Sequence, residues 1–170
     1  EGLSSSAILN FINEIEEKVD DIHSLMIVKN GKVVSEGWWN PYNENSPHEL
    51  WSLSKSFTSS AIGFAVSEGL LSVNDLVMPF FPEKIFEKPT WQLKQLRIVD
   101  LLTMNTGHVK EPKLNAADSD WESNFLSSDI QFMPGTHFLY NTPASFMLSS
   151  IIQKVSGEKL VDYLYPRLFE

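Results

Sequence analysis

A serine and a lysine three residues apart, Ser52 and Lys55, are the side chains of this sequence with the clearest potential for chemistry. If the segment is helical, the hydroxyl and the amine lie on one face and within reach of each other. A lysine that loses its proton there can act as the base that activates a serine nucleophile. A serine at a helix N-terminus also lies beside unpaired N–H groups that favour an oxyanion. A serine cap followed by a solvated lysine explains the same spacing, so the surrounding sequence must decide.

The segments before this pair predict a helix and a hairpin. Residues 4–6 are serines that suit a helix N-cap, and apolar side chains then recur at helical spacing, at Ile8, Phe11, Ile12, Ile15 and Val19. Residues 23–29 and 32–39 are two apolar runs joined by Asn30-Gly31, which is the strongest short-range signal for a hairpin with a type I′ turn.

The segments after the pair are mostly helical in pattern. One helix is expected to run from Ser52 to a left-handed cap at Gly69, and a short one over residues 98–104. Residues 108–135 are expected to be rich in loops. Two last helices are expected over residues 143–155, with proline at the first helical position, and from Lys159 onward. This order predicts an α+β or three-layer fold rather than regular βαβ winding.

Composition excludes several other functions. The net charge of −9 argues against nucleic-acid binding, which needs clustered cationic side chains. No cysteine is present, so disulfides, zinc–thiolate sites and thiol nucleophiles are excluded, and the redox compartment stays open. No apolar run reaches the roughly 18 residues of a membrane span, and no signal peptide precedes Glu1, so cytoplasmic and extracytoplasmic locations are both open.

No metal or cofactor site is expected. The histidines lack metal-binding spacing, and each is predicted to be satisfied or solvated, at positions His23, His48, His108 and His137. Asp118, Asp120 and Glu122 lack the glycine and the distant glutamate of a calcium loop, so a solvated acidic loop is expected.

Three segments of the chain resemble a known family. They read LWSLSKSFTSSAIG with EGLLSVNDLV (residues 50–63 and 68–77), RIVDLLTMNTGH (97–108) and PGTHFLYNT (134–142). In this order they resemble the motifs of the class C β-lactamase-like serine hydrolases. That family also includes penicillin-binding proteins, D-alanyl-D-alanine carboxypeptidases, family VIII esterases and 6-aminohexanoate-dimer hydrolases.

The resemblance implies a role for each matching residue. Ser52 would be the acylated nucleophile, Lys55 its activating partner, and Tyr140 the phenol that moves protons to and from the serine and the leaving group. A phenol with a pKa near 10 can do so only if a neighbouring cation lowers that pKa, and Lys55 would supply the charge. The family's chemistry requires no metal and no organic cofactor.

The tyrosine motif departs from the family pattern. The usual order is Tyr-x-Asn, whereas here Thr142 holds the third position and Asn141 comes one place early. We expect both residues to bind substrate, and Thr142 is also placed to cap the helix before Pro143. A threonine offers one hydroxyl where an asparagine offers an amide. The substitution therefore favours esters and other amides over β-lactams as the expected substrates.

A second departure concerns the end of the sequence. The family's third motif, Lys-Thr-Gly or His-x-Gly on a strand, does not follow Tyr140. The resemblance therefore implies that residues 1–170 are the N-terminal portion of one domain, with a leading helix (1–22), a hairpin (23–39) and a mostly helical part (50–170). The expected fold is a three-layer β-lactamase/transpeptidase-like α+β fold, with an antiparallel sheet flanked by helices and incomplete at its C-terminus. The hairpin would then have an unpaired edge.

These observations predict a serine hydrolase that forms an acyl-enzyme with a small-molecule ester, amide, D-amino-acid peptide or β-lactam. Two alternatives stay open. The first is a penicillin-binding or D-alanyl-D-alanine carboxypeptidase-like protein that deacylates slowly. The second is a catalytically inactive relative that serves as a binding or sensor module, because a fold does not dictate a function. The oligomeric state is not predicted.

Overall fold

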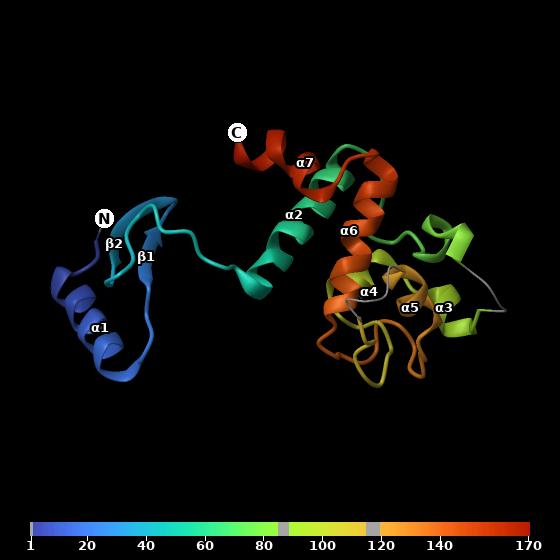
Figure 1. Ribbon diagram of the computed structural model, residues 1–170, viewed down its shortest axis with the longest axis horizontal. Helices are drawn as coiled ribbons and strands as arrows, with labels where there is room; N and C mark the ends of the chain where they lie inside the picture. Colours follow the sequence, from blue (N-terminus) through green and yellow to red (C-terminus); the bar gives the residue numbers. More distant parts are fainter. Residues whose placement is uncertain (1, 85–88, 115–119) are drawn as a thin grey trace. The chain divides into compact units, whose positions relative to one another are not determined.

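The computed structural model describes residues 2–84, 89–114 and 120–170, and the chain divides into two units, residues 1–49 and 50–170 (Figure 1). In the first unit, helix α1 (Ser5–Lys18) begins where the Ser4 side chain accepts the Ala7 N–H at 3.4 Å. Strands β1 (Ser24–Lys29) and β2 (Lys32–Trp38) pair antiparallel. The predicted helix and hairpin are therefore present; the strands lie within one residue of the expected 23–29 and 32–39, whereas the helix is four residues shorter at each end than the leading segment 1–22.

The turn between the strands has the geometry that the sequence predicts. Asn30 and Gly31 have φ angles of 50° and 74°, and a type I′ turn requires both to be positive. Val28 then faces Val33, and the register shifts between Ile27 and Val28.

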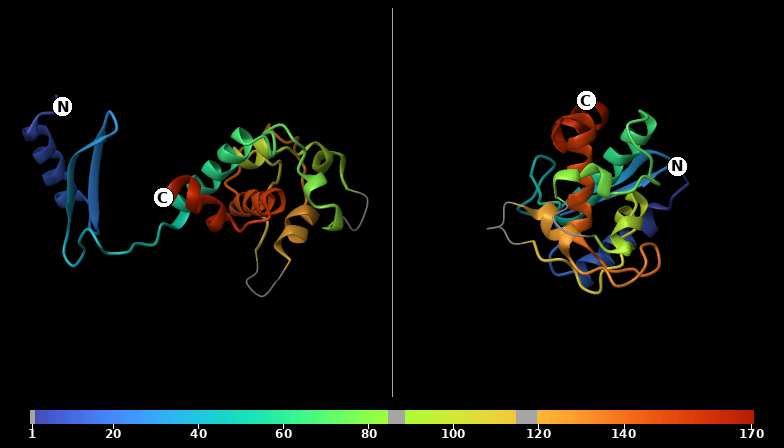
Figure 2. Two further views of the ribbon diagram at one scale, coloured as in Figure 1. Left: turned by 90° about the horizontal axis from the view of Figure 1, so that it is seen from above. Right: turned by 90° about the vertical axis from the view of Figure 1, so that its right-hand side faces the viewer.

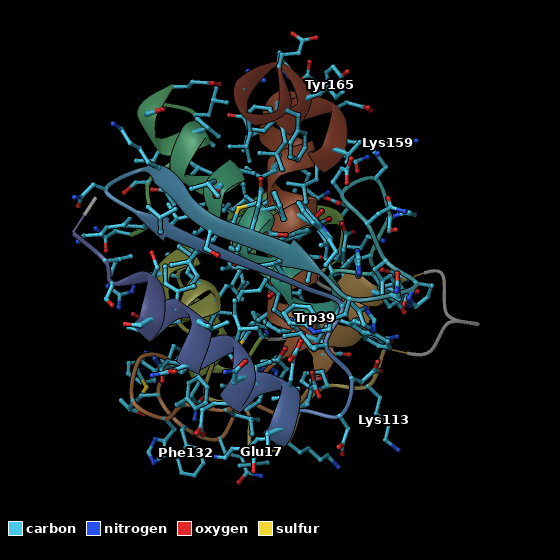
Figure 3. All side chains as sticks on the ribbon, turned by 90° about the vertical axis from the view of Figure 1, so that its left-hand side faces the viewer. Glu17, Trp39, Lys113, Phe132, Lys159 and Tyr165 are labelled. Carbon is cyan, nitrogen blue, oxygen red and sulfur yellow. The ribbon has the colours of Figure 1, made fainter. Side chains whose placement is uncertain are left out.

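Helix α1 lies along one side of this hairpin (Figure 2). Trp39, labelled in Figure 3, follows β2 and donates its indole N–H to the Glu16 carboxylate of α1 at 2.8 Å. Within residues 2–49, no side chain is buried, and Met26 and Val28 are each 57 % exposed. The strands thus carry apolar side chains on the face away from α1 as well.

The second unit is helical. Helix α2 (Ser54–Ser67) follows a 3₁₀ turn at Trp51–Leu53. The helix ends at Gly69, whose φ of 73° allows the Leu70 N–H to reach the Ala65 carbonyl at 2.9 Å, as in a Schellman cap. The later helices are α3 (Trp91–Gln95), α4 (Ile98–Leu102), α5 (Trp121–Ser127), α6 (Thr142–Ser156) and α7 (Leu160–Leu164), with a π-helical turn at Tyr165–Phe169.

Helix α6 forms the centre of this unit, where it packs against α2, α4, α5 and α7. Its buried apolar residues follow the i, i+3, i+4, i+7, i+8 pattern of one helix face, at Ala144, Met147, Leu148, Ile151 and Ile152. Apolar side chains of α2, α4 and α5 complete one core around it. The core therefore fixes both α2, which follows Ser52, and α6, which follows Tyr140.

The structure corrects two expectations about this unit. The segment 108–135 includes helix α5, although residues 115–119 lie outside the described parts. Two acidic side chains that were expected to be solvated make contacts within the protein instead. Asp120 caps α5 and binds the Lys84 ammonium at 2.9 Å, and Glu122 accepts a hydrogen bond from Ser150. Asp118 is not among the described residues. Asp120 and Glu122 therefore stabilise the fold, because the N–H groups at a helix start and a nearby cation bind a carboxylate in place of water.

Helix α3 was not expected from the sequence; its five residues carry too little periodicity to be recognised. Among the residues that the structure describes, no helix is both long and apolar enough to cross a membrane.

Candidate active site

The three predicted catalytic side chains meet in the second unit. The Ser52 hydroxyl lies 2.6 Å from the Tyr140 phenol oxygen, across 88 residues of sequence. Lys55 Nζ donates to Ser52 Oγ at 3.0 Å and lies 5.1 Å from the centre of the Tyr140 ring. A hydroxyl, an ammonium and a phenol thus share one cluster of hydrogen bonds.

The local backbone brings Ser52 and Lys55 together. Ser52 lies in the 3₁₀ turn and Lys55 in the first turn of α2, and side chains three residues apart on a continuous helical backbone are neighbours. Trp51, directly before the serine, has a φ of 47°, which is rare for a bulky residue and costs energy. Such strain is typical of functional sites, and here it marks a sharp change of chain direction at Ser52.

The phenol of Tyr140 is chemically activated by this arrangement. The hydrogen bond from Lys55 has the largest effect and lowers the pKa of Tyr140 below its ordinary value of 10, and the hydrogen bond with Ser52 lowers it further. Burial opposes these two effects and raises the pKa, while smaller effects of the Lys55 charge and the Thr142 side chain lower it again. The side chain is 47 % exposed, so a substrate can reach it.

Residues 97–108, the second of the three family-like segments, bind the backbone of residues 134–142, the third, through hydrogen bonds. The Leu139 N–H donates to the Met104 carbonyl at 3.0 Å, and the Gly135 N–H donates to the Asn105 carbonyl at 2.7 Å. Gly107, with φ of 84°, accepts the Phe132 N–H, and a Cβ on this glycine would lie 2.2 Å from the Phe132 oxygen. Only glycine fits there. Residues 104–107 therefore serve as the support on which the segment leading to Tyr140 lies.

Asn141 does not occupy the place that the sequence suggested. The residue is fully buried; its side-chain oxygen accepts the Ala144 N–H at 2.9 Å, and its amide NH₂ donates to Thr106 Oγ1 at 3.2 Å. The cap expected of Thr142 thus belongs to Asn141. Both ends of this amide are used inside the protein, so Asn141 is not offered to a substrate.

Thr142 remains at the site. Its side chain forms a hydrogen bond that lowers the pKa of Tyr140, and its backbone N–H donates to Glu111 Oε1 at 2.7 Å. Glu111, Pro112, Lys113 and Thr142 help to line a cavity of about 530 Å³. This cavity carries side-chain charge of both signs, and Thr142, which follows Tyr140 by two residues, is one of its lining residues.

Sequence reasoning missed Glu111, Thr106 and the environment of His108. His108 was expected to be satisfied or solvated, whereas it is 2 % exposed and its Nε2 has no hydrogen-bond partner. One feature of the sequence could have indicated these residues. Thr106 and His108 lie within the family-like segment 97–108, and Glu111 follows it by three residues. Among the described residues, no group of three acidic or histidine side chains is arranged to hold a metal ion.

Comparisons with known proteins agree with this geometry. A family model described as Beta-lactamase matches residues 13–170. A curated Beta-lactamase of Pseudomonas fluorescens is 26 % identical over 160 residues, which covers 85 % of this chain and 43 % of that protein. The chain therefore spans less than half of the length of this relative.

Solved structures show the same fold. FmtA of Staphylococcus aureus is similar with a TM-score of 0.78 at 16 % identity, over 98 % of this chain and 48 % of FmtA. The octameric penicillin-binding protein homologue of Pyrococcus abyssi is similar with a TM-score of 0.68 at 22 % identity, over 98 % of this chain and 42 % of that protein. The predicted β-lactamase/transpeptidase-like α+β fold class is thus confirmed, and by its sequence and its fold the chain belongs to the Beta-lactamase family.

Proposed function

We propose that this chain carries the nucleophile of a serine hydrolase that acts through an acyl-enzyme. The observation that carries the proposal is the contact of Ser52 Oγ with two proton-transfer groups at once, Tyr140 at 2.6 Å and Lys55 at 3.0 Å. A serine hydroxyl is a weak nucleophile unless a neighbouring base takes its proton. The lowered pKa of Tyr140 raises the fraction of the phenolate, which is the form of this side chain that can take that proton.

In the acylation step, Tyr140, supported by the Lys55 charge, takes the Ser52 proton while Oγ forms a bond to the carbonyl carbon of the substrate. The carbonyl π electrons move to oxygen, and the Ser52 N–H, which lies in the first turn of its helical segment, helps to hold this oxyanion. The bond to the leaving group then breaks, and Tyr140 returns its proton to the departing oxygen or nitrogen.

In the deacylation step, a water molecule repeats the sequence. Its proton passes to Tyr140 while its oxygen attacks the acyl carbon, and the proton returns to Ser52 Oγ as the ester bond to the enzyme breaks. The products are the free acid and the regenerated serine. The proposed substrate is a small ester, amide or lactam whose leaving group lies within reach of the Tyr140 phenol.

The alternative of slow deacylation, typical of a penicillin-binding protein, has one observation in its favour. Thr142 lies where the family pattern has asparagine, so one hydroxyl replaces an amide beside the acyl-enzyme. With a chromogenic ester, fast turnover predicts a steady rate of product release, whereas slow deacylation predicts a burst of one equivalent followed by little further product.

The direct test is the intact mass of the chain after treatment with a fluorophosphonate. We expect one stoichiometric adduct on the unmodified chain and none on Ser52→Ala. Ser56→Ala is the matched control and should label normally, because Ser56 is an exposed serine of the same helix outside the cluster. Tyr140→Phe should slow labelling by about 100- to 10,000-fold, as loss of a general base does. Equal labelling of Ser52→Ala, or no labelling of a chain that is folded by circular dichroism, would contradict the proposal.

A further inference from the structure

A buried histidine beside the tyrosine segment has an unexplained nitrogen. His108 is 2 % exposed, and its Nε2 is the one buried side-chain nitrogen or oxygen without a hydrogen-bond partner among the described residues. The Phe125 backbone favours a proton on this imidazole without completing a hydrogen bond to Nε2. Buried polar atoms are rarely left unpaired, so the position of this imidazole calls for an explanation.

The other nitrogen of His108 begins a chain of hydrogen bonds. His108 Nδ1 lies 2.8 Å from Thr106 Oγ1, which also receives the Asn141 Nδ2–H at 3.2 Å. Asn141 in turn accepts the Ala144 N–H, which starts α6. All three side chains are buried, so water does not compete for these bonds. The three residues, named here the buried relay, connect the interior of the unit to the residue next to Tyr140.

The direction of each bond follows from the donors available. Asn141 donates its NH₂ to Thr106, so the single hydroxyl proton of Thr106 is free to point at His108 Nδ1. Because the Phe125 backbone favours a proton on the imidazole and Nδ1 has Thr106 as its partner, we assign the proton to Nε2, so that Nδ1 accepts from Thr106. In this arrangement His108 is neutral.

We propose that His108, Thr106 and Asn141 are positioning residues that hold Tyr140 against Ser52. The inference rests on the proposed function, in which Tyr140 moves the Ser52 proton. Almost half of the Tyr140 side chain is exposed, so packing alone does not fix the phenol. Its backbone is held on one side by Leu139, bonded to the Met104 carbonyl, and on the other side by Asn141, bonded to Thr106.

Burial keeps the relay in its neutral form. Desolvation has the largest effect and lowers the pKa of His108 from 6.5 to about 4, against opposing effects of the Phe125 backbone and the Asp129 charge. The Phe125 ring, 5.0 Å away on α5, adds no charge. Because unfolded His108 binds its proton near pH 6.5, stability falls as the pH drops from 6.5 to about 4. Below about pH 4, Nδ1 carries a proton and can no longer accept from Thr106, so the bond between these two residues must reverse its direction.

The test compares threonine variants of the whole chain and measures the phenol titration of Tyr140 by NMR of ¹³C-labelled tyrosine. In Thr106→Val, which removes the hydroxyl and keeps the shape, we expect the pKa of Tyr140 to rise toward its ordinary value. Fluorophosphonate labelling of Ser52 should slow by up to about 100-fold, the effect of a small misplacement of a catalytic group. Thr106→Ser restores the hydroxyl and should retain both properties.

Thr103→Val is the matched control, because Thr103 is exposed and its hydroxyl donates only to the Val99 carbonyl of its own helix. The control should leave the pKa of Tyr140 and the labelling rate unchanged. A folded Thr106→Val chain with an unchanged pKa of Tyr140 would overturn the inference.

The phenol titration needs no reaction at Ser52. The experiments can therefore contradict the proposed function without contradicting the positioning of Tyr140, and the reverse. An unlabelled wild-type chain contradicts the proposed function, while the titration still decides whether the relay positions Tyr140. If Thr106→Val does not fold, ¹⁵N NMR of His108 in the wild-type chain takes its place. A proton on Nε2 at pH 7 supports the relay, and a proton on Nδ1 overturns it.

Discussion

The two units of this chain, residues 2–49 and 50–170, use apolar side chains in different ways. Among its described residues, the second unit buries twenty of them in one core around α6. In the first unit none is buried, and the hairpin presents apolar residues on both faces, with Leu25 and Ile27 half-covered and Met26 and Val28 exposed. Strands that are apolar on both faces are typical of sheets covered on both sides.

The difference teaches where the candidate site obtains its rigidity. Ser52, Lys55 and Tyr140 all belong to the unit that has its own core, and their segments lead directly into α2 and α6. A catalytic group must keep its position within a fraction of an ångström, which a packed core can provide. The hairpin contributes none of these three side chains.

The largest expected effect that would test this comparison comes from truncating one isoleucine in each unit. Ile151→Ala removes a fully buried side chain of α6 and should lower the free energy of unfolding by about 2–5 kcal/mol. Ile27→Ala removes a half-covered side chain of β1 and should cost about 1 kcal/mol. Urea unfolding followed by circular dichroism measures both. Equal costs would mean that the hairpin is packed as well as the helical unit.

Hydrogen exchange of the unmodified chain should show the same contrast without any substitution. The α6 amides around Ile151 and Ile152 are expected to exchange on the order of 100-fold or more slowly than the β1 and β2 amides. The reason is that opening of the hairpin exposes little buried surface, whereas opening of α6 disrupts the whole core. Two-dimensional NMR after transfer to D₂O gives the rates. Similar protection in both units would break the comparison.

A smaller effect on the free energy of unfolding is expected from the ion pair between Glu68 and Arg167 in the helical unit. Glu68, at the end of α2, accepts hydrogen bonds from Arg167 at 2.6 and 3.2 Å and from the Tyr163 hydroxyl at 3.0 Å. The Arg167 hydrogen bond has the largest effect and lowers the pKa of Glu68 below 4.5, although burial opposes it. The unfolded chain therefore binds this proton at higher pH than the folded chain. The stabilisation is complete above pH 4.5 and is lost as the pH falls through the lowered pKa.

Urea unfolding at several pH values between 3 and 6 tests this linkage, and Glu68→Gln should flatten the profile. Glu14→Gln in the first unit is the matched control. Glu14 and Lys18 are an exposed i, i+4 pair on α1, which solvent and salt screen, so the profile should stay unchanged. An unaltered profile in Glu68→Gln would show that another carboxyl carries the acid sensitivity.

Sequence patterns predicted best where a few neighbouring residues decide the structure. The Asn30-Gly31 turn and the Gly69 cap formed as expected, because each depends on a positive φ that few residues adopt. Patterns failed where an element is short or where two neighbours compete for one role. Helix α5 was missed because its seven residues carry little helical periodicity, although Asp120 caps it locally through the Ser123 N–H. The Asn141 cap was assigned to its neighbour, because proline tolerates several capping registers.

The sequence by itself determined the proximity of Ser52 and Lys55 and the family, since the two residues lie one turn apart in any helical conformation and three family motifs occur in order. Only the tertiary structure decided what surrounds the pair. It placed the Tyr140 phenol on Ser52, turned Asn141 into the core and removed His108 from water. The physical reason is range: spacing within one turn is set by backbone geometry, whereas contacts across 88 residues depend on how the loops and helices pack around α6.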